Sequence, residues 1–169
     1  MGREGTGPAP GLGPGTLALV HRLVASSFGL GLIPRRLWGS DAGAGTFGAA
    51  LGAAVAVPLL WAPWWAGSAV ALAAIAASLW SAAPFSRDHA DPGWVCMDET
   101  AGTLVAAVGL GAWPWAVALL VARAADIVKV LPGVRAAERL PGAIGVTADD
   151  VVAGLYGLAV GWVLTAAGL

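Results

Sequence analysis

The chain has 169 residues, of which 58% are hydrophobic and only 11% are charged, against roughly 25% charged residues in an average soluble domain. With a mean hydropathy of +0.78, this composition indicates an integral membrane protein of a single domain. The formal net charge of −1 and the lack of a basic segment exclude nucleic acid as an expected partner. The one cysteine, Cys96, excludes an internal disulfide and a cysteine-based zinc site.

The charged residues are confined to three polar segments, which are 1–41, 87–99 and 123–150. The remaining chain forms three apolar blocks without a charged side chain, which are 42–86, 100–122 and 151–169. Most of the nine tryptophans stand near the ends of these blocks, which is typical of an aromatic belt at a membrane interface.

The first polar segment opens with a tail that is rich in glycine and proline. Residues 1–16 are therefore predicted to be disordered, and residues 17–169 to form a single membrane-embedded domain. Within 17–30, apolar residues recur at helical spacing, which predicts a short interfacial or core helix.

The first apolar block is too long for one membrane helix, which takes about 20 residues. Its middle, residues 60–67, combines a proline and a glycine with three tryptophans, so a helix breaker lies beside interfacial aromatic residues. We therefore predict two antiparallel helices, roughly 46–61 and 64–82, that turn there and return the chain to the same side of the membrane.

The second apolar block allows two arrangements. As one helix, residues 100–122 could span the membrane and would place Glu99 and Arg123 on opposite faces. Its centre, residues 109–115, again holds glycines, a proline and two tryptophans, which favours a hairpin. Each arm of about 10–12 residues would measure only ~18 Å, so the arms extend into the polar segments or form a re-entrant pair. We favour the hairpin, because it returns every polar segment to one face.

The last apolar block follows Thr147 and two aspartates. Thr147 as N-cap with Asp150 at the third helical position resembles a capping box. This predicts a helix from about 148 to 166, long enough to span the membrane. Because the arginines and the one lysine collect in the polar segments, the positive-inside rule places that face in the cytoplasm.

With the polar segments on one face, their carboxylates become potential neighbours. They belong to Asp91, Asp98, Glu99, Asp126, Asp149 and Asp150, and the cations around them are Arg123, Lys129, Arg135 and Arg139. Several hard oxygen ligands suit Mg²⁺, and cations beside a metal stabilise the charge that develops on a phosphate during its transfer. Metal-assisted phosphoryl chemistry at a membrane surface is therefore the sharpest hypothesis.

Plainer explanations exist for each part of this set. Asp98 and Asp149 stand at expected helix starts, where a carboxylate can cap the helix or face water. Arg123 and Asp126 are spaced as an ordinary ion pair within a helix. From residue types and spacing alone, these explanations and the metal site both stay open.

Four blocks in order resemble the phosphatidylglycerophosphatase A family, over about Ala25 to Gly161. Gly45-Thr46-Phe47-Gly48-Ala49 is similar to its G-T-x-G-S motif, and Asp91–Gly102 resembles D-x-G-x-x-V-x-D-E-x-x-G, with slightly different neighbours around Cys96. Arg123–Lys129 resembles R-x-x-D-x-x-K-P-x-P, and Gly142–Gly154 resembles G-G-x-G-I-M-x-D-D-x-x-A-G. The chain departs from the serine, proline, glycine and methionine of these patterns at Ala49, Val130, Ala143 and Thr147. None of these changes removes a charged group.

The hairpins and the resemblance together imply an all-α, multihelical integral membrane protein with a polar site at the cytoplasmic face of the bacterial inner membrane. The resemblance further implies a Mg²⁺-dependent phosphatase that hydrolyses phosphatidylglycerophosphate to phosphatidylglycerol in phospholipid biosynthesis. By position, the catalytic and metal-binding carboxylates would be Asp98, Glu99, Asp149 and Asp150, with Asp126 as a further metal ligand. The phosphate would be held by Arg123, Lys129, Thr46 and Gly45, and Asp91 would shape a loop or support the acids.

Two other functions fit parts of the pattern. A CDP-alcohol phosphotransferase is also a small membrane protein with metal-binding aspartates, but its D-G-x-x-A-R…G…D…D signature is absent from this sequence. A small ion transporter or membrane scaffold would place its acids along a path at mid-membrane depth, whereas each of the six acids named above stands at a predicted boundary. The sequence makes no prediction of the oligomeric state.

Overall fold

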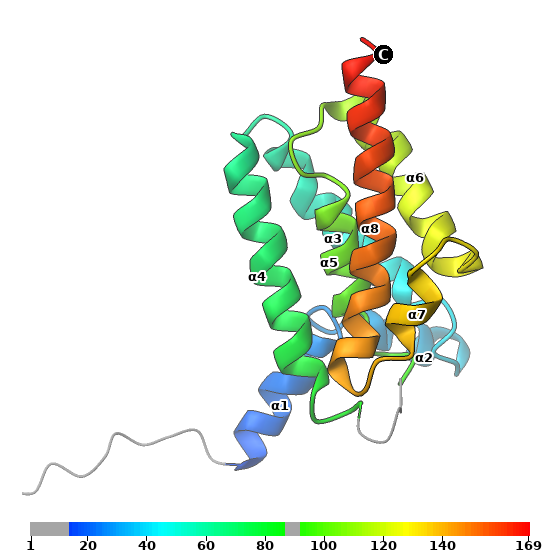
Figure 1. Cartoon of the computed structure of the whole chain (residues 1–169). Coiled ribbons are helices and arrows are strands. Elements are labelled where there is room, and N and C mark those ends of the chain that lie inside the picture. Colours follow the sequence, from blue (N-terminus) through cyan, green and yellow to red (C-terminus); the bar gives the residue numbers. More distant parts are fainter. Residues whose placement is uncertain (1–13, 87–91) are drawn as a thin grey trace, which may run out of the picture.

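The computed structural model describes residues 14–86 and 92–169, and over these ranges it is all-helical, as the sequence predicts (Figure 1). Its elements in chain order are α1 (Pro14–Ala25), the 3-10 helix η1 (Leu30–Leu32), α2 (Ile33–Trp38), α3 (Ala44–Leu59), α4 (Trp64–Ala82), α5 (Met97–Val105), α6 (Ala112–Val128), α7 (Val134–Glu138) and α8 (Ala143–Ala166). The predictions for Asp91 and for residues 1–13 of the tail lie outside the described residues, while residues 14–16 belong to α1.

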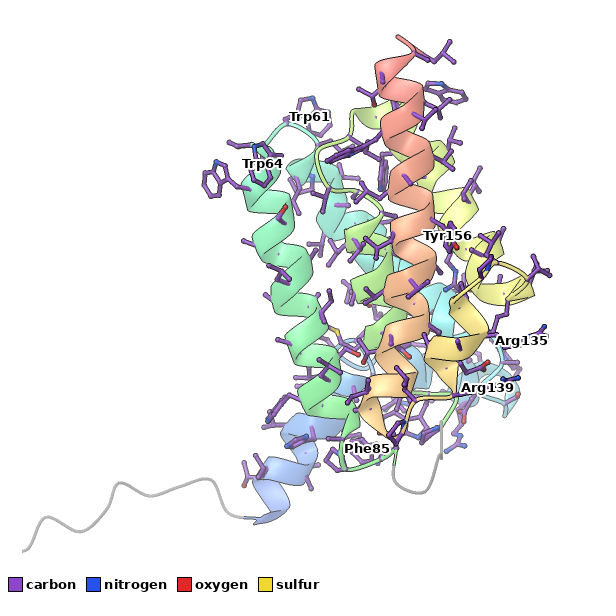
Figure 2. All side chains as sticks on the ribbon, in the orientation of Figure 1. Trp61, Trp64, Phe85, Arg135, Arg139 and Tyr156 are labelled. Carbon is purple, nitrogen blue, oxygen red and sulfur yellow. The ribbon has the colours of Figure 1, made fainter. Side chains whose placement is uncertain are left out.

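The described parts of the three polar segments lie at one end of the helix bundle. The helices α3, α5 and α8 begin at this end and α4 and α6 finish there, so both predicted hairpins are confirmed (Figure 1). We call this the polar end; Phe85, Arg135 and Arg139 lie there (Figure 2). Trp61 and Trp64 lie at the opposite end, around the turn between α3 and α4 (Figure 2).

The second apolar block is a hairpin because its centre cannot continue a helix. After α5 ends at Val105, Gly109 adopts a φ of +68°, which glycine adopts without the steric cost that a side chain brings. Pro114 is the third residue of α6, where its missing N–H breaks no helical hydrogen bond. Both arms extend into the neighbouring polar segments, since α5 starts at Met97 and α6 ends at Val128.

The short helix α5 is enclosed by longer ones, since it packs against α3, α4 and α8. All of its residues except Glu99 are buried. Glycines allow the neighbouring backbones to approach: a Cβ at Gly52 of α3 would lie 2.7 Å from the Thr100 carbonyl oxygen, and one at Gly102 would lie 2.6 Å from that of Asp150 in α8. With nine residues, or about 14 Å, α5 is too short to cross a membrane and lies inside the bundle.

A buried hydroxyl network fixes the start of α5. Ser27 Oγ donates to the Cys96 carbonyl oxygen at 2.9 Å and lies 2.8 Å from Thr100 Oγ1. Thr100 Oγ1 in turn donates to the Gly48 carbonyl oxygen at 2.8 Å. Ser27 reaches this place from a left-handed backbone with φ +48°. The short helix predicted within 17–30 is present as α1, which ends at Ala25, and η1 and α2 follow the turn.

The helix α8 begins at Ala143 rather than near residue 148. Its N-cap is Gly142 and no side chain caps it, so the predicted capping box at Thr147 is wrong. Thr147 is fully buried, and its Oγ1 lies 2.8 Å from Ser78 Oγ of α4, with which it shares a hydrogen bond. The spacing of Thr147 and Asp150 gave a wrong prediction, because the hydrogen-bond partner of the Thr147 hydroxyl lies on another helix.

Two helices, α4 and α8, are long and apolar enough to cross a membrane. The bent pair Gly15–Ala25 and Leu30–Trp38, with an angle of 83° between its parts, adds a third if it is one broken span. The apolar helix α3 is shorter, with 16 residues. Large apolar side chains such as Leu72 and Val163 are exposed on α4 and α8, as expected of surfaces that face lipid.

Replacing Gly52 by alanine should destabilise the fold, because the new methyl group would meet the Thr100 carbonyl oxygen and the Thr103 side chain. Overpacking of this kind costs about 1–3 kcal/mol, so thermal unfolding in detergent should give a lower Tm. The matched control is Gly15→Ala in α1, where no atom lies within 4 Å of the added Cβ. This control should keep or raise the Tm, since alanine favours helix. An unchanged Tm for Gly52→Ala would contradict the close packing of α3 on α5.

Candidate active site

The first part of the site is the N-terminal turn of α5. Asp98 and Glu99 are the second and third residues of this helix, after the N-cap Cys96, so the helix dipole favours their negative charge. Burial raises the pKa of Glu99, although a hydrogen bond with Asp98 and the charge of Arg123 act against this rise. Only 5% of Asp98 is exposed, so this acid is not a solvated surface charge.

The second part of the site lies in the second turn of α8. Asp149 and Asp150 are the seventh and eighth residues of this helix, beyond the first turn in which capping and the helix dipole act. Both side chains are buried, with 5% and 7% exposed. Capping is therefore excluded as the reason for these two acids, and each of them needs a compensating partner.

The third part of the site, the C-terminal end of α6, supplies the cations. Arg123 Nη1 donates to Asp126 Oδ2 at 2.8 Å and lies 3.8 Å from Asp150 Oδ1. Lys129 Nζ donates to Asp149 Oδ2 at 2.8 Å and to Glu138 Oε1 at 2.6 Å. The two cations thus join α6 to the acids of α8.

Lys129 has an unusual backbone conformation for a residue with a side chain. It is the C-cap of α6, with a φ of +50°, in the left-handed region that costs roughly 1 kcal/mol. Its N–H still donates to the Ala125 carbonyl oxygen at 2.9 Å. Burial opposes the ammonium charge, but the hydrogen bonds to Asp149 and Glu138 outweigh burial and raise the pKa of Lys129. Lys129 therefore stays charged across the physiological range.

The acids form two groups that share one member. Carboxylate oxygens of Asp98, Glu99 and Asp150 lie within 4.8 Å of one another, and so do those of Asp126, Asp149 and Asp150. We call these five residues the carboxylate cluster. Asp149 Oδ1 is buried without a hydrogen-bond partner, an arrangement that is costly unless a ligand completes it.

In the carboxylate cluster the acids outnumber the cations. Its five carboxylates are accompanied by the two cations Arg123 and Lys129, and Lys129 is shared with Glu138. The remaining negative charge is crowded and partly withdrawn from water, which is unfavourable without compensation. Clustered hard oxygen ligands of this kind fit a divalent cation such as Mg²⁺.

Gly45 of α3 completes the site from a fourth element. A Cβ at this position would overlap Glu99 Oε1 and would lie 3.4 Å from Arg123 Nη2, so only glycine lets α3 come this close to both side chains. Thr46, the next residue, is exposed on the first turn of α3. The structure thus places Gly45 at the site and Thr46 next to it, while phosphate binding by either residue stays a prediction.

The structure brings together the charged site residues predicted on α5, α6 and α8. Sequence reasoning missed Glu138, the second partner of Lys129, and the role of Ser27 and Thr100 in fixing α5. Lys129 and Glu138 are nine residues apart, and the chain leaves α6 and enters α7 between them. No helical period connects two residues across such a turn, so no signal in the sequence pointed to this pair.

Replacing Lys129 by methionine should lower the free energy of unfolding by about 1–3 kcal/mol, because Asp149 would lose its charged partner inside the bundle. Glu138→Gln is the matched control, since it removes the more exposed acid from the same lysine, which should cost less than about 1 kcal/mol. Unfolding in detergent with a chelator present measures both variants. Equal losses for the two would contradict a structural role for the Lys129–Asp149 pair.

Comparison with known proteins agrees with this geometry. The model of the family described as phosphatidylglycerophosphatase A matches residues 23–165, which include all the site residues above. A relative from Bacteroides thetaiotaomicron named "Putative phosphatidylinositol-3-phosphatase" is 33% identical over 145 residues, which cover 79% of this chain and 86% of the relative. No solved structure matches the chain. The chain therefore belongs to the phosphatidylglycerophosphatase A family and is a lipid phosphatase, a phosphoric monoester hydrolase.

Proposed function

We propose that the protein hydrolyses phosphatidylglycerophosphate to phosphatidylglycerol and phosphate, with Mg²⁺ as its cofactor. The observation that carries this proposal is the carboxylate cluster, in which Asp150 belongs to both groups of acids and Arg123 and Lys129 lie beside them. Membership of a family described as phosphatidylglycerophosphatase supports the substrate. The relative is named as a phosphatase of a phosphoinositide, a lipid that also carries a phosphomonoester on its headgroup.

The residues of the site are suitable ligands for Mg²⁺. All the donors are carboxylates, which Mg²⁺ prefers, and the buried Asp149 Oδ1 has no hydrogen-bond partner of its own. Asp98, Glu99, Asp126, Asp149 and Asp150 are the residues that would hold the ion. When bound, Mg²⁺ would neutralise charge on the phosphate oxygens and so make the phosphorus atom easier to attack.

Arg123 and Lys129 would hold the phosphate oxygens that face away from the carboxylates. Arg123 uses Nη1 for Asp126, while its Nη2 lies near Gly45. Lys129 is fixed by two hydrogen bonds. Cations held in place before the reaction need no reorganisation as charge develops on the transferred group.

Hydrolysis breaks the bond between phosphorus and the headgroup oxygen. Water supplies the hydroxyl group that phosphorus gains, and the headgroup oxygen takes a proton and leaves as the alcohol of phosphatidylglycerol. One acid of the cluster either orients the water and accepts its proton, or attacks phosphorus itself and is released by water in a second step. Asp98 and Asp149 are the acids whose replacement best tests this role, because both are buried and held on helices.

We place this reaction at the cytoplasmic face of a bacterial inner membrane. The polar end collects Arg35, Arg123, Lys129, Arg135 and Arg139, and positive charge marks the cytoplasmic side of membrane proteins. A site at the end of the spanning helices α4 and α8 could receive a headgroup while the acyl chains stay in the bilayer. An ion transporter is less well supported, because the acids of the cluster stand near the starts of α5 and α8 and near the end of α6, at the polar end and not at mid-depth.

Phosphate release by the purified protein tests the proposal. With Mg²⁺ we expect phosphatidylglycerophosphate to be hydrolysed faster than phosphatidic acid or phosphatidylinositol 3-phosphate, and a chelator to abolish the reaction. Asp98→Asn and Asp149→Asn should each lower turnover by about 10²-fold or more. The matched control is Asp41→Asn, which removes an acid that pairs with Arg35 outside the cluster. No release from any lipid would refute the function, and full activity of both cluster variants would refute the site.

Gly45→Ala should reduce activity more than stability. The added methyl group would displace the Glu99 carboxylate, which is the end of a flexible side chain and not backbone. Because groups that orient metal ligands contribute about 10–100-fold, we expect turnover about tenfold lower, or a correspondingly higher Mg²⁺ requirement, at nearly unchanged Tm. Gly52→Ala should show the opposite pattern, with a lower Tm and near-normal turnover below it. Wild-type Mg²⁺ dependence and turnover in Gly45→Ala would contradict the contact.

A further inference from the structure

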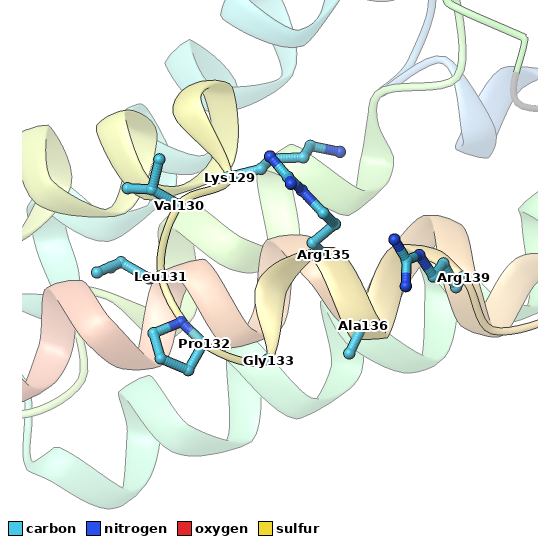
Figure 3. A pocket seen from close by; sticks show the side chains of 8 residues that line it. All are labelled: Lys129, Val130, Leu131, Pro132, Gly133, Arg135, Ala136 and Arg139. Atoms are coloured by element: carbon cyan, nitrogen blue, oxygen red, sulfur yellow. The ribbon is translucent and has the colours of Figure 1, made fainter.

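Two hollows lie side by side next to the carboxylate cluster. The first, which we call the basic pocket, has a volume of about 420 Å³, and its lining includes Lys129, Arg135 and Arg139 (Figure 3). The second, which we call the apolar groove, has a volume of about 260 Å³ and is lined entirely by apolar residues, namely Val121, Ala124, Ala125, Val128, Val130 and Leu131. Val130 and Leu131 line both hollows, so the two adjoin at this segment.

A single residue, Lys129, borders both the basic pocket and the carboxylate cluster. Lys129 lines the pocket and also donates to Asp149 of the cluster. Arg135 and Arg139 are exposed and four residues apart, and neither forms an ion pair within the described part of the chain. In Figure 3 the three cationic side chains lie on one side of the pocket, and Val130 and Leu131 point away from them. Among the described residues these two arginines have no acid partner, so the pocket offers them to an anion.

The apolar groove extends the basic pocket along α6. Its residues Val128 and Val130 are 56% and 72% exposed, although both are strongly apolar. The helix α6 packs against α8, one of the two helices long enough to cross a membrane. The groove therefore lies along a helix that packs on a candidate membrane span, where an exposed apolar surface suits a lipid chain.

We propose that these two hollows bind the substrate lipid, with an acyl chain in the apolar groove and the phosphodiester of the headgroup held by Arg135 and Arg139. The order of groove, basic pocket and carboxylate cluster is the order of acyl chain, phosphodiester and terminal phosphomonoester along such a lipid. This inference rests on the proposed function and defines its substrate class. The substrates are phospholipids in which a short polyol separates the phosphodiester from the phosphomonoester. Phosphatidic acid has no phosphodiester, so it gains nothing from the two arginines.

Kinetics of the full-length protein with both arginines replaced, Arg135→Gln with Arg139→Gln, test the basic pocket. For phosphatidylglycerophosphate we expect KM to rise about tenfold, since each exposed charge pair contributes about threefold, while kcat changes less than about twofold. For phosphatidic acid we expect no change in kcat/KM. If the protein does not hydrolyse phosphatidic acid, its inhibition constant Ki should be unchanged. Arg36→Gln, which alters an exposed arginine of α2 outside both hollows, is the matched control. Equal effects on the two lipids, or an equal effect of the control, would overturn the inference.

Photolabelling tests the apolar groove without catalysis. The probe is phosphatidylglycerol with a diazirine in one acyl chain, presented in lipid nanodiscs with a chelator present. We expect labelled peptides to centre on residues 121–131 and labelling to fall several-fold in the double arginine variant. A diacylglycerol probe with the same diazirine chain has no phosphodiester and should show no such fall. Uniform labelling of α4 and α6 would overturn the inference. If the protein releases no phosphate from any lipid, the proposed function fails. The labelling pattern still decides whether the two hollows bind a lipid.

Discussion

The structure depends on the compensation of crowded negative charge beside an apolar helix bundle. Five carboxylates lie in two overlapping groups, and Arg123 and Lys129 are cations that contact them. Leaving a buried charge without a partner costs several kcal/mol, so these cations hold the end of α6 against α8. The negative charge that they leave over is the reason why we propose a divalent ion. Binding of such an ion would stabilise the folded state by mass action, so that stability and catalysis would share one set of acids.

The short helix α5 determines the position of two of these acids, Asp98 and Glu99. A helix that spans the bundle would have to be amphipathic or wholly apolar, whereas α5 is only nine residues long and carries two acids in its first turn. Its enclosure is possible because Gly52, Gly102 and Gly154 let three backbones approach within van der Waals distance. Hydrogen bonds from Ser27 to the Cys96 carbonyl oxygen and from Thr100 to the Gly48 carbonyl oxygen then fix the helix start. Small residues therefore determine where Asp98 and Glu99 lie, although they take no part in the chemistry.

Much of this arrangement could be predicted from the sequence, because charge and helix breakers are strong local signals. The breakers at residues 60–67 and 109–115 predicted both hairpins, and the hairpins predicted that the polar segments share one end. The start of α8 could not be predicted, since the hydroxyl partner of Thr147 is Ser78 on another helix. The left-handed turn at Ser27 and the pairing of Lys129 with Glu138 were missed for the same reason. Each depends on contacts between segments that no periodic pattern connects.

Lys129 connects the chemistry of the site with its lipid recognition. Its left-handed φ ends α6 and turns the chain, so that its ammonium group faces Asp149 while residues 130–133 line the basic pocket. A regular helical residue at this position would carry α6 onward and would separate the apolar groove from the two arginines of the pocket. Left-handed backbone at a residue with a side chain is unfavourable and persists where the surroundings enforce it. The two hydrogen bonds of the Lys129 ammonium group hold the residue in this conformation. Lys129 then borders both the carboxylate cluster and the basic pocket.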